Sequence, residues 1–344
     1  MVTAAVTGFG SAVPAVMDQQ GLWDGYFERH YDGSQLARRL WSASGITTRH
    51  GVLDPRQEDV STWGTAARME RFLVEAMPLG AEAVSIALKD AGLSADEVDL
   101  LTVVSCTGYV TPGLDILLAR DLGMRPSVQR LNIGHMGCYA ALPGLATVAD
   151  ATAARGLTSV LLCLELPSLH VQPAADEPQQ MVAHSLFSDA AAAVVLQPGA
   201  GLEVLRTVAR TDSDSAEHMT WDVTDLGFKM GLSPRVPQVL AEHVRAVVEE
   251  LLGGLAIEDV FGWAVHPGGP RILDVCQEQL GLPAEALAAS RRTLRDFGNC
   301  SSGTVLLVLD ELQRSTPVPT GGHVVMMAFG PGLTLYATLL RATG

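Results

Sequence analysis

The sequence of 344 residues predicts a layered α/β fold. Apolar runs of strand length alternate with amphipathic windows of helical length, a pattern typical of layered α/β proteins. The order of strands and helices begins again after residues 199–201, so we expect two α/β halves, residues 1–200 and 201–344. A hydrophobic content of 48% beside 18% charged residues indicates a compact globular chain. Because no linker-like segment separates the halves, we expect them to pack as one body.

The first half is predicted from its apolar runs and stop signals. The expected elements are a helix over 82–91 that ends at Gly92, a helical start at 94–97, a strand over 100–106, a helix over 115–122, and strands over 159–165 and 190–196. The run 159–165 (Ser-Val-Leu-Leu-Cys-Leu-Glu) is apolar almost throughout, which indicates a strand buried on both faces.

The second half repeats the alternation without a visible sequence repeat. Strands are expected over 202–210, 262–266 and 324–328, and helices over 236–252, 271–280 and 304–313. We interpret this as a weak duplication of architecture.

Charge and cysteine usage exclude several classes of function. A formal net charge of −15 argues against a nucleic-acid partner, and the basic cluster of Arg291, Arg292 and Arg295 is too small to reverse that field. No apolar stretch reaches the length of about 20 residues that a membrane helix needs. The five cysteines form no CxxC pair or metal-ligand spacing, and residues 1–6 lack a basic signal-peptide start. We therefore expect free thiols in a reducing cytoplasm and no metal site.

Cys138 is the strongest candidate nucleophile. It follows a strand-like segment, 127–133, and precedes a small-residue run, 140–155, that predicts a buried helix. Gly134 and Gly137 break the chain between the two, which predicts a tight strand-to-helix turn. Unpaired backbone N–H groups and the helix dipole at such a turn favour thiolate over thiol.

His266 and Asn299 are the candidate partners of Cys138, and each residue alone has an ordinary structural explanation. A cysteine after glycine can be a packed small side chain, a histidine before Pro-Gly-Gly can cap a turn, and an asparagine after glycine can occupy a left-handed turn. The combination points to thioester chemistry. A thiolate attacks an acyl carbonyl, while imidazole and carboxamide can stabilise a thiolate, an oxyanion or an enolate.

Four motifs, in order along the chain, carry a family resemblance. Residues 137–140 (Gly-Cys-Tyr-Ala), 263–270 (Trp-Ala-Val-His-Pro-Gly-Gly-Pro) and 298–302 (Gly-Asn-Cys-Ser-Ser) resemble the nucleophile, histidine and asparagine motifs of type III polyketide synthases. Residues 329–334 (Phe-Gly-Pro-Gly-Leu-Thr) resemble their C-terminal loop, with Ala328 in place of its first glycine. Initiating ketoacyl synthases share the first three motifs but not this loop. The chain thus resembles the chalcone-synthase-like branch of the thiolase superfamily.

The resemblance implies a thiolase-like αβαβα body, a homodimer, and a mechanism. Cys138 would take an acyl group from a starter acyl-CoA, and His266 and Asn299 would hold the thioester of malonyl-CoA during decarboxylation. Coenzyme A thioesters would be substrates, with no separate cofactor. Two alternatives stay open: an initiating ketoacyl synthase-like acyltransferase or single-condensation enzyme, and a non-catalytic thiolase-fold scaffold.

The resemblance also implies a set of substrate-binding residues. Phe187 and Phe228 match the two phenylalanines that gate the substrate tunnel, apolar rings at the neck before the thiol. Cys106 stands where relatives vary a cavity-lining residue, and an ordinary buried thiol is the alternative. Pro167 stands where relatives have a small wall residue, so a stiffer wall is expected to restrict the starter.

The basic entrance for coenzyme A departs from the family pattern. Arg39 matches one family position, but Leu36 and Ala43 stand where lysines are often found. Arg271 is a candidate to offset this loss, and an acyl carrier protein is an alternative thioester donor. Thr111 replaces a methionine that reaches across the dimer in plant relatives, so the dimer contact to the cavity is expected to differ.

Overall fold

A computed structural model describes residues 3–344 and places one nine-stranded sheet at the centre of the molecule. The strand order is β11-β12-β13-β8-β1-β7-β6-β4-β5. These strands are β1 (Ala4–Ala12), β4 (Leu100–Ser105), β5 (Gln129–Gly134), β6 (Ser159–Glu165), β7 (Ala190–Pro198), β8 (Gly201–Thr211), β11 (Val260–Val265), β12 (His323–Gly330) and β13 (Thr334–Thr343). Two ribbons pair β2 (Val16–Asp18) with β3 (Thr48–His50), and β9 (Met219–Thr224) with β10 (Gly227–Leu232).

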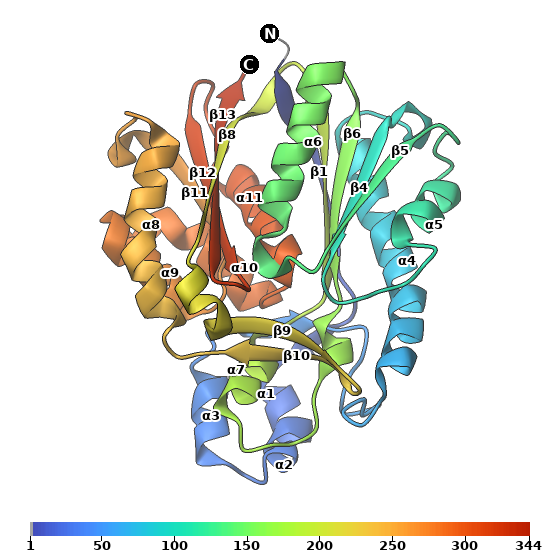
Figure 1. The fold of residues 1–344 in the computed structure, drawn as a ribbon, viewed down its shortest axis with the longest axis vertical. Coiled ribbons are helices and arrows are strands. Elements are labelled where there is room, and N and C mark those ends of the chain that lie inside the picture. The colour runs from blue at the N-terminus through green and yellow to red at the C-terminus, as the bar shows by residue number, and fades with distance from the viewer. Residues whose placement is uncertain (1–2) are drawn as a thin grey trace.

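The helices form three layers around this curved sheet. They are α1 (Gln19–Leu22), α2 (Glu28–His30), α3 (Gln35–Ser42), α4 (Thr65–Asp90), α5 (Leu114–Asp121), α6 (Ala141–Arg155), α7 (Pro178–Leu186), α8 (Val236–Leu252), α9 (Pro270–Leu280), α10 (Ala288–Phe297) and α11 (Thr304–Ser315). Helices α6 and α11 lie in the middle, with α4 and α5 outside one half of the sheet and α8 and α9 outside the other (Figure 1). The body therefore has the αβαβα layering of the thiolase-like fold.

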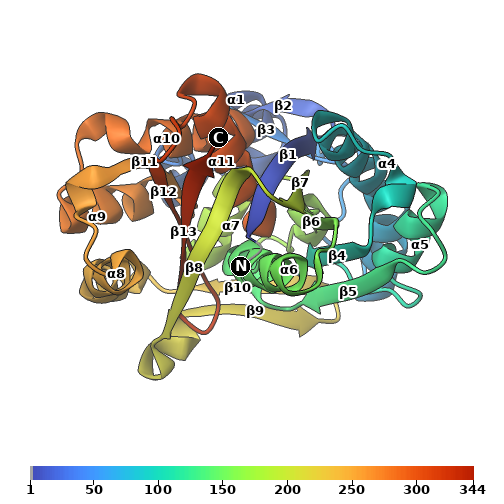
Figure 2. The same cartoon turned by 90° about the horizontal axis from the view of Figure 1, so that it is seen from above.

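The strand pairing repeats on the two sides of the β1–β8 junction. In the first half, β1–β7 and β7–β6 are antiparallel and β6–β4 is parallel. In the second half, β8–β13 and β13–β12 are antiparallel and β12–β11 is parallel. Because β1 also pairs with β8, the two halves share one sheet, as Figure 2 shows from above. The expected boundary at residues 200–201 falls at the turn between β7 and β8.

Most of the elements expected from sequence are present within a few residues of their predicted bounds. The strand 159–165 and the helix 236–252 have the predicted bounds, and all seven residues of β6 are buried. Helix α4 is longer than expected because Pro78 lies within it without ending it. The segment 94–97 forms only a short 3-10 turn with a capping box. Within residues 3–344, no helix combines the length and the apolar character that a bilayer crossing requires.

Arg68 of α4 makes hydrogen bonds to two loops that lie far apart in the sequence. It is fully buried, and its guanidinium donates to the backbone carbonyls of Val60, Ser61, Trp63, Leu169 and Val171. Burial lowers the pKa of Arg68 to about 10, so it remains a cation at neutral pH. Its charge is therefore solvated by backbone dipoles.

Arg68→Met is expected to lower the free energy of unfolding by roughly 3–5 kcal/mol, because several buried carbonyls lose their donor at about 1–3 kcal/mol each. Urea unfolding measures this loss. Arg120→Met on the exposed face of α5 is the matched control and should change stability by no more than about 0.5 kcal/mol. Equal effects of the two changes would contradict the proposed role of Arg68.

Candidate active site

Cys138 lies on a tight turn between β5 and α6, as the sequence predicts. Gly137 has a φ of +74°, and a Cβ there would come within 2.4 Å of Pro331 Cδ. Residues Gly137–Tyr139 form a 3-10 turn that leads into α6. Only glycine therefore lets the C-terminal loop pack against the nucleophile turn. The Cys138 side chain is buried at the floor of a cavity.

The expected preference of Cys138 for thiolate is wrong for this arrangement. Burial raises the pKa of the Cys138 thiol to about 12. A 3.6 Å contact with Ser301 Oγ and the backbone N–H of the turn lower this pKa, and the nearby charge of Glu165 raises it. Because desolvation outweighs the helix N-terminus, Cys138 is a thiol until a partner accepts its proton.

His266 follows β11 and lies at the carboxyl end of the second half of the sheet. Its backbone N–H donates to Met327 O of β12 at 2.8 Å, and its carbonyl accepts from Gly268 N–H at 3.0 Å. Burial lowers the pKa of His266 to about 3, so the ring is neutral. Its Nδ1 atom is buried and has no hydrogen-bond partner in the described part of the chain. Nδ1 is therefore an unsatisfied buried polar atom of the site.

Asn299 has a carboxamide of fixed orientation. Ser301 N–H donates to Oδ1 at 2.9 Å, which identifies that atom as the oxygen. The Nδ2 group then faces the other way and lies 3.5 Å from the backbone oxygen of Gly268, two residues after His266. Asn299 N–H also donates to Leu186 O, and its carbonyl accepts from Ser188 N–H, both at 2.9 Å. These bonds place the carboxamide against the segment that carries Phe187.

The three candidate catalytic residues line one cavity of about 550 Å³, which we call the outer cavity. Arg271 and Phe187 also line it, together with Leu36 and Leu40 of α3 and Ala43 at its end. Arg271 is largely exposed and pairs with Glu278 at 3.1 Å. Arg39 is exposed on α3 and does not line this cavity, although its sequence neighbour Leu40 does. The outer cavity thus brings four of the predicted residues beside Cys138 and leaves Arg39 outside.

Two small cavities lie beyond Phe187. The inner cavity, of about 10 Å³, is lined by Cys138, Cys106, Thr107, Pro167, Phe187, Trp221, Met230, Ser301, Gly137 and Pro331. The distal cavity, of about 60 Å³, is bordered by Phe187, Pro167, Trp221, Phe228 and His170, among others. Phe187 borders all three cavities, whereas Phe228 borders only the distal one. The predicted role of a gate between the cavities therefore suits Phe187 better than Phe228.

The comparisons with known proteins agree over the whole chain. The description of the N-terminal domain of chalcone and stilbene synthases matches residues 2–200, and that of their C-terminal domain matches 206–344. The chain belongs to the chalcone and stilbene synthase family. An alpha-pyrone synthesis polyketide synthase-like protein of Mycobacterium tuberculosis is 33% identical over 98% of this chain and 90% of its own length. The 1,3,6,8-tetrahydroxynaphthalene synthase of Streptomyces peucetius is 34% identical over 89% and 83%.

Solved structures of this family have the same fold. The C-terminal type III polyketide synthase domain of Steely1 from Dictyostelium superposes with a TM-score of 0.94 and 27% identity, over 99% of this chain and all of that domain. The tetrahydroxynaphthalene synthase of Streptomyces coelicolor gives a TM-score of 0.92 and 28% identity, over 99% of both chains. The chain is a type III polyketide synthase, a transferase that works by decarboxylative condensation. These matches favour this family over an initiating ketoacyl synthase or a non-catalytic scaffold.

Glu165 is a buried member of the chalcone and stilbene synthase site that sequence reasoning missed. Its carboxylate accepts from Ser302 Oγ at 2.6 Å, Thr107 Oγ1 at 2.7 Å and Cys106 N–H at 3.0 Å. Burial raises the pKa of this carboxyl group. The sequence does contain a signal for this residue, because Glu165 is an acidic residue at the end of an otherwise apolar strand. A carboxylate buried there needs hydrogen-bond donors around it.

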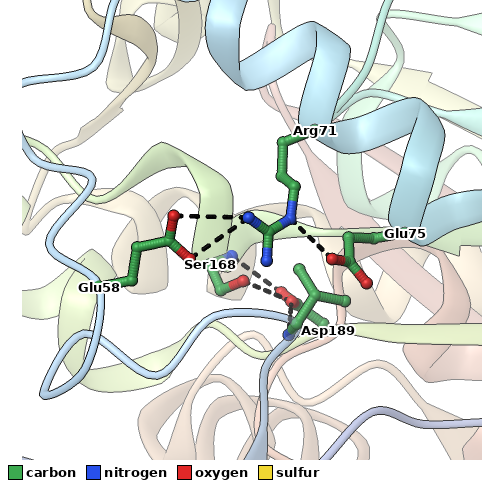
Figure 3. A network of polar contacts seen from close by, with 6 residues as sticks. Glu58, Arg71, Glu75, Ser168 and Asp189 are labelled. Atoms are coloured by element: carbon green, nitrogen blue, oxygen red, sulfur yellow. Dashed lines mark hydrogen bonds and ion pairs between the residues drawn. The ribbon is translucent and has the colours of Figure 1, made fainter.

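A second buried carboxylate, Asp189, supports the wall beside Pro167. It accepts from the backbone N–H groups of Ser168 and Val52, each at 2.8 Å, and from the Ser168 hydroxyl. Figure 3 shows this group and, in the same view, a separate cluster in which Arg71 of α4 pairs with Glu58 and Glu75. Burial raises the pKa of Asp189 to about 6. These contacts join the loop after β3, the turn at Pro167 and the start of β7.

His184 of α7 is held as a neutral ring near the distal cavity. Gln172 N–H donates to Nε2 at 3.1 Å, so the proton lies on Nδ1, which is 2.6 Å from Tyr31 Oη. Burial lowers the pKa of His184 to about 3. Protonation of Nε2 would place its new N–H group against the N–H of Gln172 and break this hydrogen bond.

Acid is expected to destabilise the fold through His184. The unfolded imidazole takes up a proton near pH 6.5 while the folded ring stays neutral to about pH 3, so stability falls as the pH falls through this window. The expected cost is about 1.4 kcal/mol per pH unit. His184→Gln keeps one acceptor and one donor but does not titrate, so its urea-unfolding free energy should depend less steeply on pH. Parallel pH profiles for the two proteins would contradict this role.

Proposed function

We propose that this type III polyketide synthase carries an acyl group on Cys138 and extends it with malonyl-CoA held by His266 and Asn299. The convergence of these three side chains on the outer cavity carries this assignment of roles. The cavity wall is mostly apolar, which strengthens each polar interaction inside it.

The first step is acyl transfer to Cys138. The thiol passes its proton to His266, which forms a thiolate–imidazolium pair in which each charge stabilises the other. The thiolate attacks the thioester carbonyl of the starter, the carbon–sulfur bond to coenzyme A breaks, and the imidazolium returns its proton to the departing coenzyme A thiolate. His266 is again neutral after this step, and Cys138 holds a thioester.

The second step is decarboxylation and carbon–carbon bond formation. The malonyl C–C bond breaks, CO₂ leaves, and the electron pair moves to the thioester oxygen, where His266 and the Asn299 Nδ2 group donate hydrogen bonds. The enolate carbon then attacks the acyl carbon on Cys138, and the carbon–sulfur bond to Cys138 breaks. Cys138 leaves as a thiolate that takes up a proton, and the acyl chain, now longer by two carbons, is a thioester of coenzyme A. Neither step requires a separate cofactor, so we propose none.

A panel of acyl-CoA starters with malonyl-CoA tests this function. We expect CO₂ release, an acyl mass increment on Cys138, and pyrone, resorcinol or related polyketide products by mass spectrometry. An acyl adduct that malonyl-CoA leaves unchanged would instead indicate an acyltransferase. Absence of both decarboxylation and condensation across the panel would overturn the proposal.

The thioester donor is a second point to test. Leu36 and Ala43 make the α3 side of the outer cavity apolar, and Arg271 lines it from α9. We propose coenzyme A thioesters as donors, with Arg271 and Arg39 contacting their phosphates. The two donors are distinguished by comparing the rates for the same acyl group attached to coenzyme A and to an acyl carrier protein. The Arg271→Gln variant should raise the KM for the coenzyme A thioester and leave the KM for the carrier-protein thioester unchanged.

We also propose a homodimer that forms along β5. This strand is at one edge of the sheet, five of its six residues are exposed, and Tyr109 nearby is 65% exposed. An unpaired, exposed sheet edge of this kind favours pairing with a second chain. Light scattering should give a dimer mass for the chain and a monomer mass for Leu131→Glu.

We also propose a cytoplasmic location for the protein, on the evidence of its five free thiols.

A further inference from the structure

The positions of the three cavities restrict where the acyl group can lie during extension. His266 and Asn299 line the outer cavity and neither of the small ones, whereas Cys138 lines the outer and inner cavities. Malonyl-CoA must therefore occupy the outer cavity when these donors hold its thioester. An acyl chain on Cys138 then competes with malonyl-CoA for the outer cavity unless it lies on the inner side of Phe187, in the inner cavity that Cys138 also lines. The space on that side limits which acyl groups can be extended.

That space is small compared with the outer cavity. The inner cavity has about 10 Å³ and the distal cavity about 60 Å³, against about 550 Å³ on the outer side. A volume of about 10–15 Å³ on this measure holds one water-sized group. An acetyl group fits such a space after small shifts, whereas a long aliphatic chain needs a continuous channel.

Trp221 of β9 is the largest of the four side chains that border both small cavities, the others being Pro167, Phe187 and Met230. It borders both small cavities, and its indole N–H donates to Cys106 O at 2.7 Å. Its ring lies 6.0 Å from Phe228, 5.6 Å from His170 and 6.4 Å from Phe187 between centroids. The hydrogen bond anchors the hairpin of β9 and β10 to the end of β4, so the indole cannot swing away without losing a buried partner.

His170 holds the neighbouring wall in place. Phe228 N–H donates to Nδ1 at 3.0 Å, so the proton lies on Nε2, which donates to Thr107 O at 2.7 Å. The imidazole also stacks on the Phe228 ring at 4.5 Å and 10°. Both ring nitrogens are thus used by backbone groups, and Trp221 packs edge-on against a fixed pair of rings.

We propose that Trp221 is the end wall of the acyl chamber and restricts extension to short acyl groups such as acetyl. This inference rests on the proposed function and names its substrate class. A long acyl group can still be loaded on Cys138, because it can lie in the outer cavity while no extender is present. It then excludes malonyl-CoA and is not extended. Loading and extension therefore have different length limits.

The test measures the two steps separately with acetyl-CoA and octanoyl-CoA. Intact-protein mass spectrometry reports loading on Cys138, and product mass reports extension with malonyl-CoA. We expect the natural chain to load both acyl groups and extend only acetyl. Trp221→Ala should raise octanoyl extension roughly 10- to 200-fold, the range that one change in an apolar pocket produces. Trp221→Leu is the second variant if the alanine protein unfolds, with a smaller gain expected.

Two further variants make the result specific. Trp221→Phe keeps a ring at the wall and should keep the preference for acetyl. Val223→Ala changes a side chain on the same strand that is 65% exposed and lines none of the three cavities, so its chain-length profile should match that of the natural chain. A change that only loosened the hairpin would lower both loading and extension and would not select octanoyl.

Malonyl-CoA decarboxylation, followed in the same samples, reports the proposed function by itself. If decarboxylation proceeds and the natural chain extends octanoyl as well as acetyl, the size limit is overturned and the proposed function stands. A folded, decarboxylating Trp221→Ala protein without any gain in octanoyl extension would overturn the role of Trp221.

Discussion

Cys138→Ala is expected to abolish acyl loading and to lower condensation by roughly 10⁴-fold or more, because no other group can hold the acyl chain beside His266 and Asn299. Malonyl-CoA decarboxylation should continue, since both donors to its thioester oxygen remain. Intact-protein mass after incubation with an acyl-CoA measures loading. Product formation and CO₂ release are measured in parallel samples.

Cys276→Ala is the matched control for this change. Cys276 is a buried thiol of α9 that lines none of the three cavities around the site. This variant should keep loading, decarboxylation and condensation. An acyl increment on the Cys138→Ala protein would show that another cysteine is the acyl carrier, with Cys106 of the inner cavity as the nearest alternative.

Asn299→Ala is expected to reduce malonyl-CoA decarboxylation by roughly 100- to 1000-fold, the usual effect of removing one donor to a developing oxyanion. Loading of Cys138 should fall far less, because the carboxamide acts on the enolate. Asn299→Asp adds a sharper comparison, since its carboxylate still accepts from Ser301 N–H but has no Nδ2 donor. It should lose decarboxylation as fully as the alanine variant.

Equal losses of loading and decarboxylation in both variants would contradict this division of roles. The thermal midpoint serves as the check on folding, because the backbone of Asn299 bridges Leu186 and Ser188 whatever its side chain. A variant with an unchanged midpoint and a selective loss of decarboxylation supports a role of the carboxamide in the reaction itself.

The buried strands and long helices could be predicted because their residues are apolar in a regular pattern. Strand β6 and helix α8 are examples, with bounds that match the predicted ones. Strand β1 was not predicted, because its small residues Gly8 and Gly10 weaken the strand signal. Those glycines are needed by packing, since a Cβ at Gly10 would come within 2.2 Å of the backbone of α4. Such a contact between distant segments leaves no local pattern.

The candidate site could be predicted in part. Cys138, His266 and Asn299, each within two residues of a glycine, identified the chemistry, and the structure brings them to one cavity. Trp221 was missed because it lies in a half-exposed hairpin whose polar alternation resembles an ordinary surface ribbon. The protonation of Cys138 was also wrong in prediction, because a turn at a helix N-terminus favours thiolate only where the thiol is not desolvated.

By itself the sequence determined the layered α/β fold, the thioester chemistry and its three principal residues, because these depend on local patterns and on the reactivity of particular side chains. Only the tertiary structure decided that Cys138 is a buried thiol, that Arg39 lies outside the outer cavity, and that Trp221 borders both small cavities. These properties depend on desolvation and on the distances between segments far apart in the chain. Neither quantity is contained in the order of residues until the chain has folded.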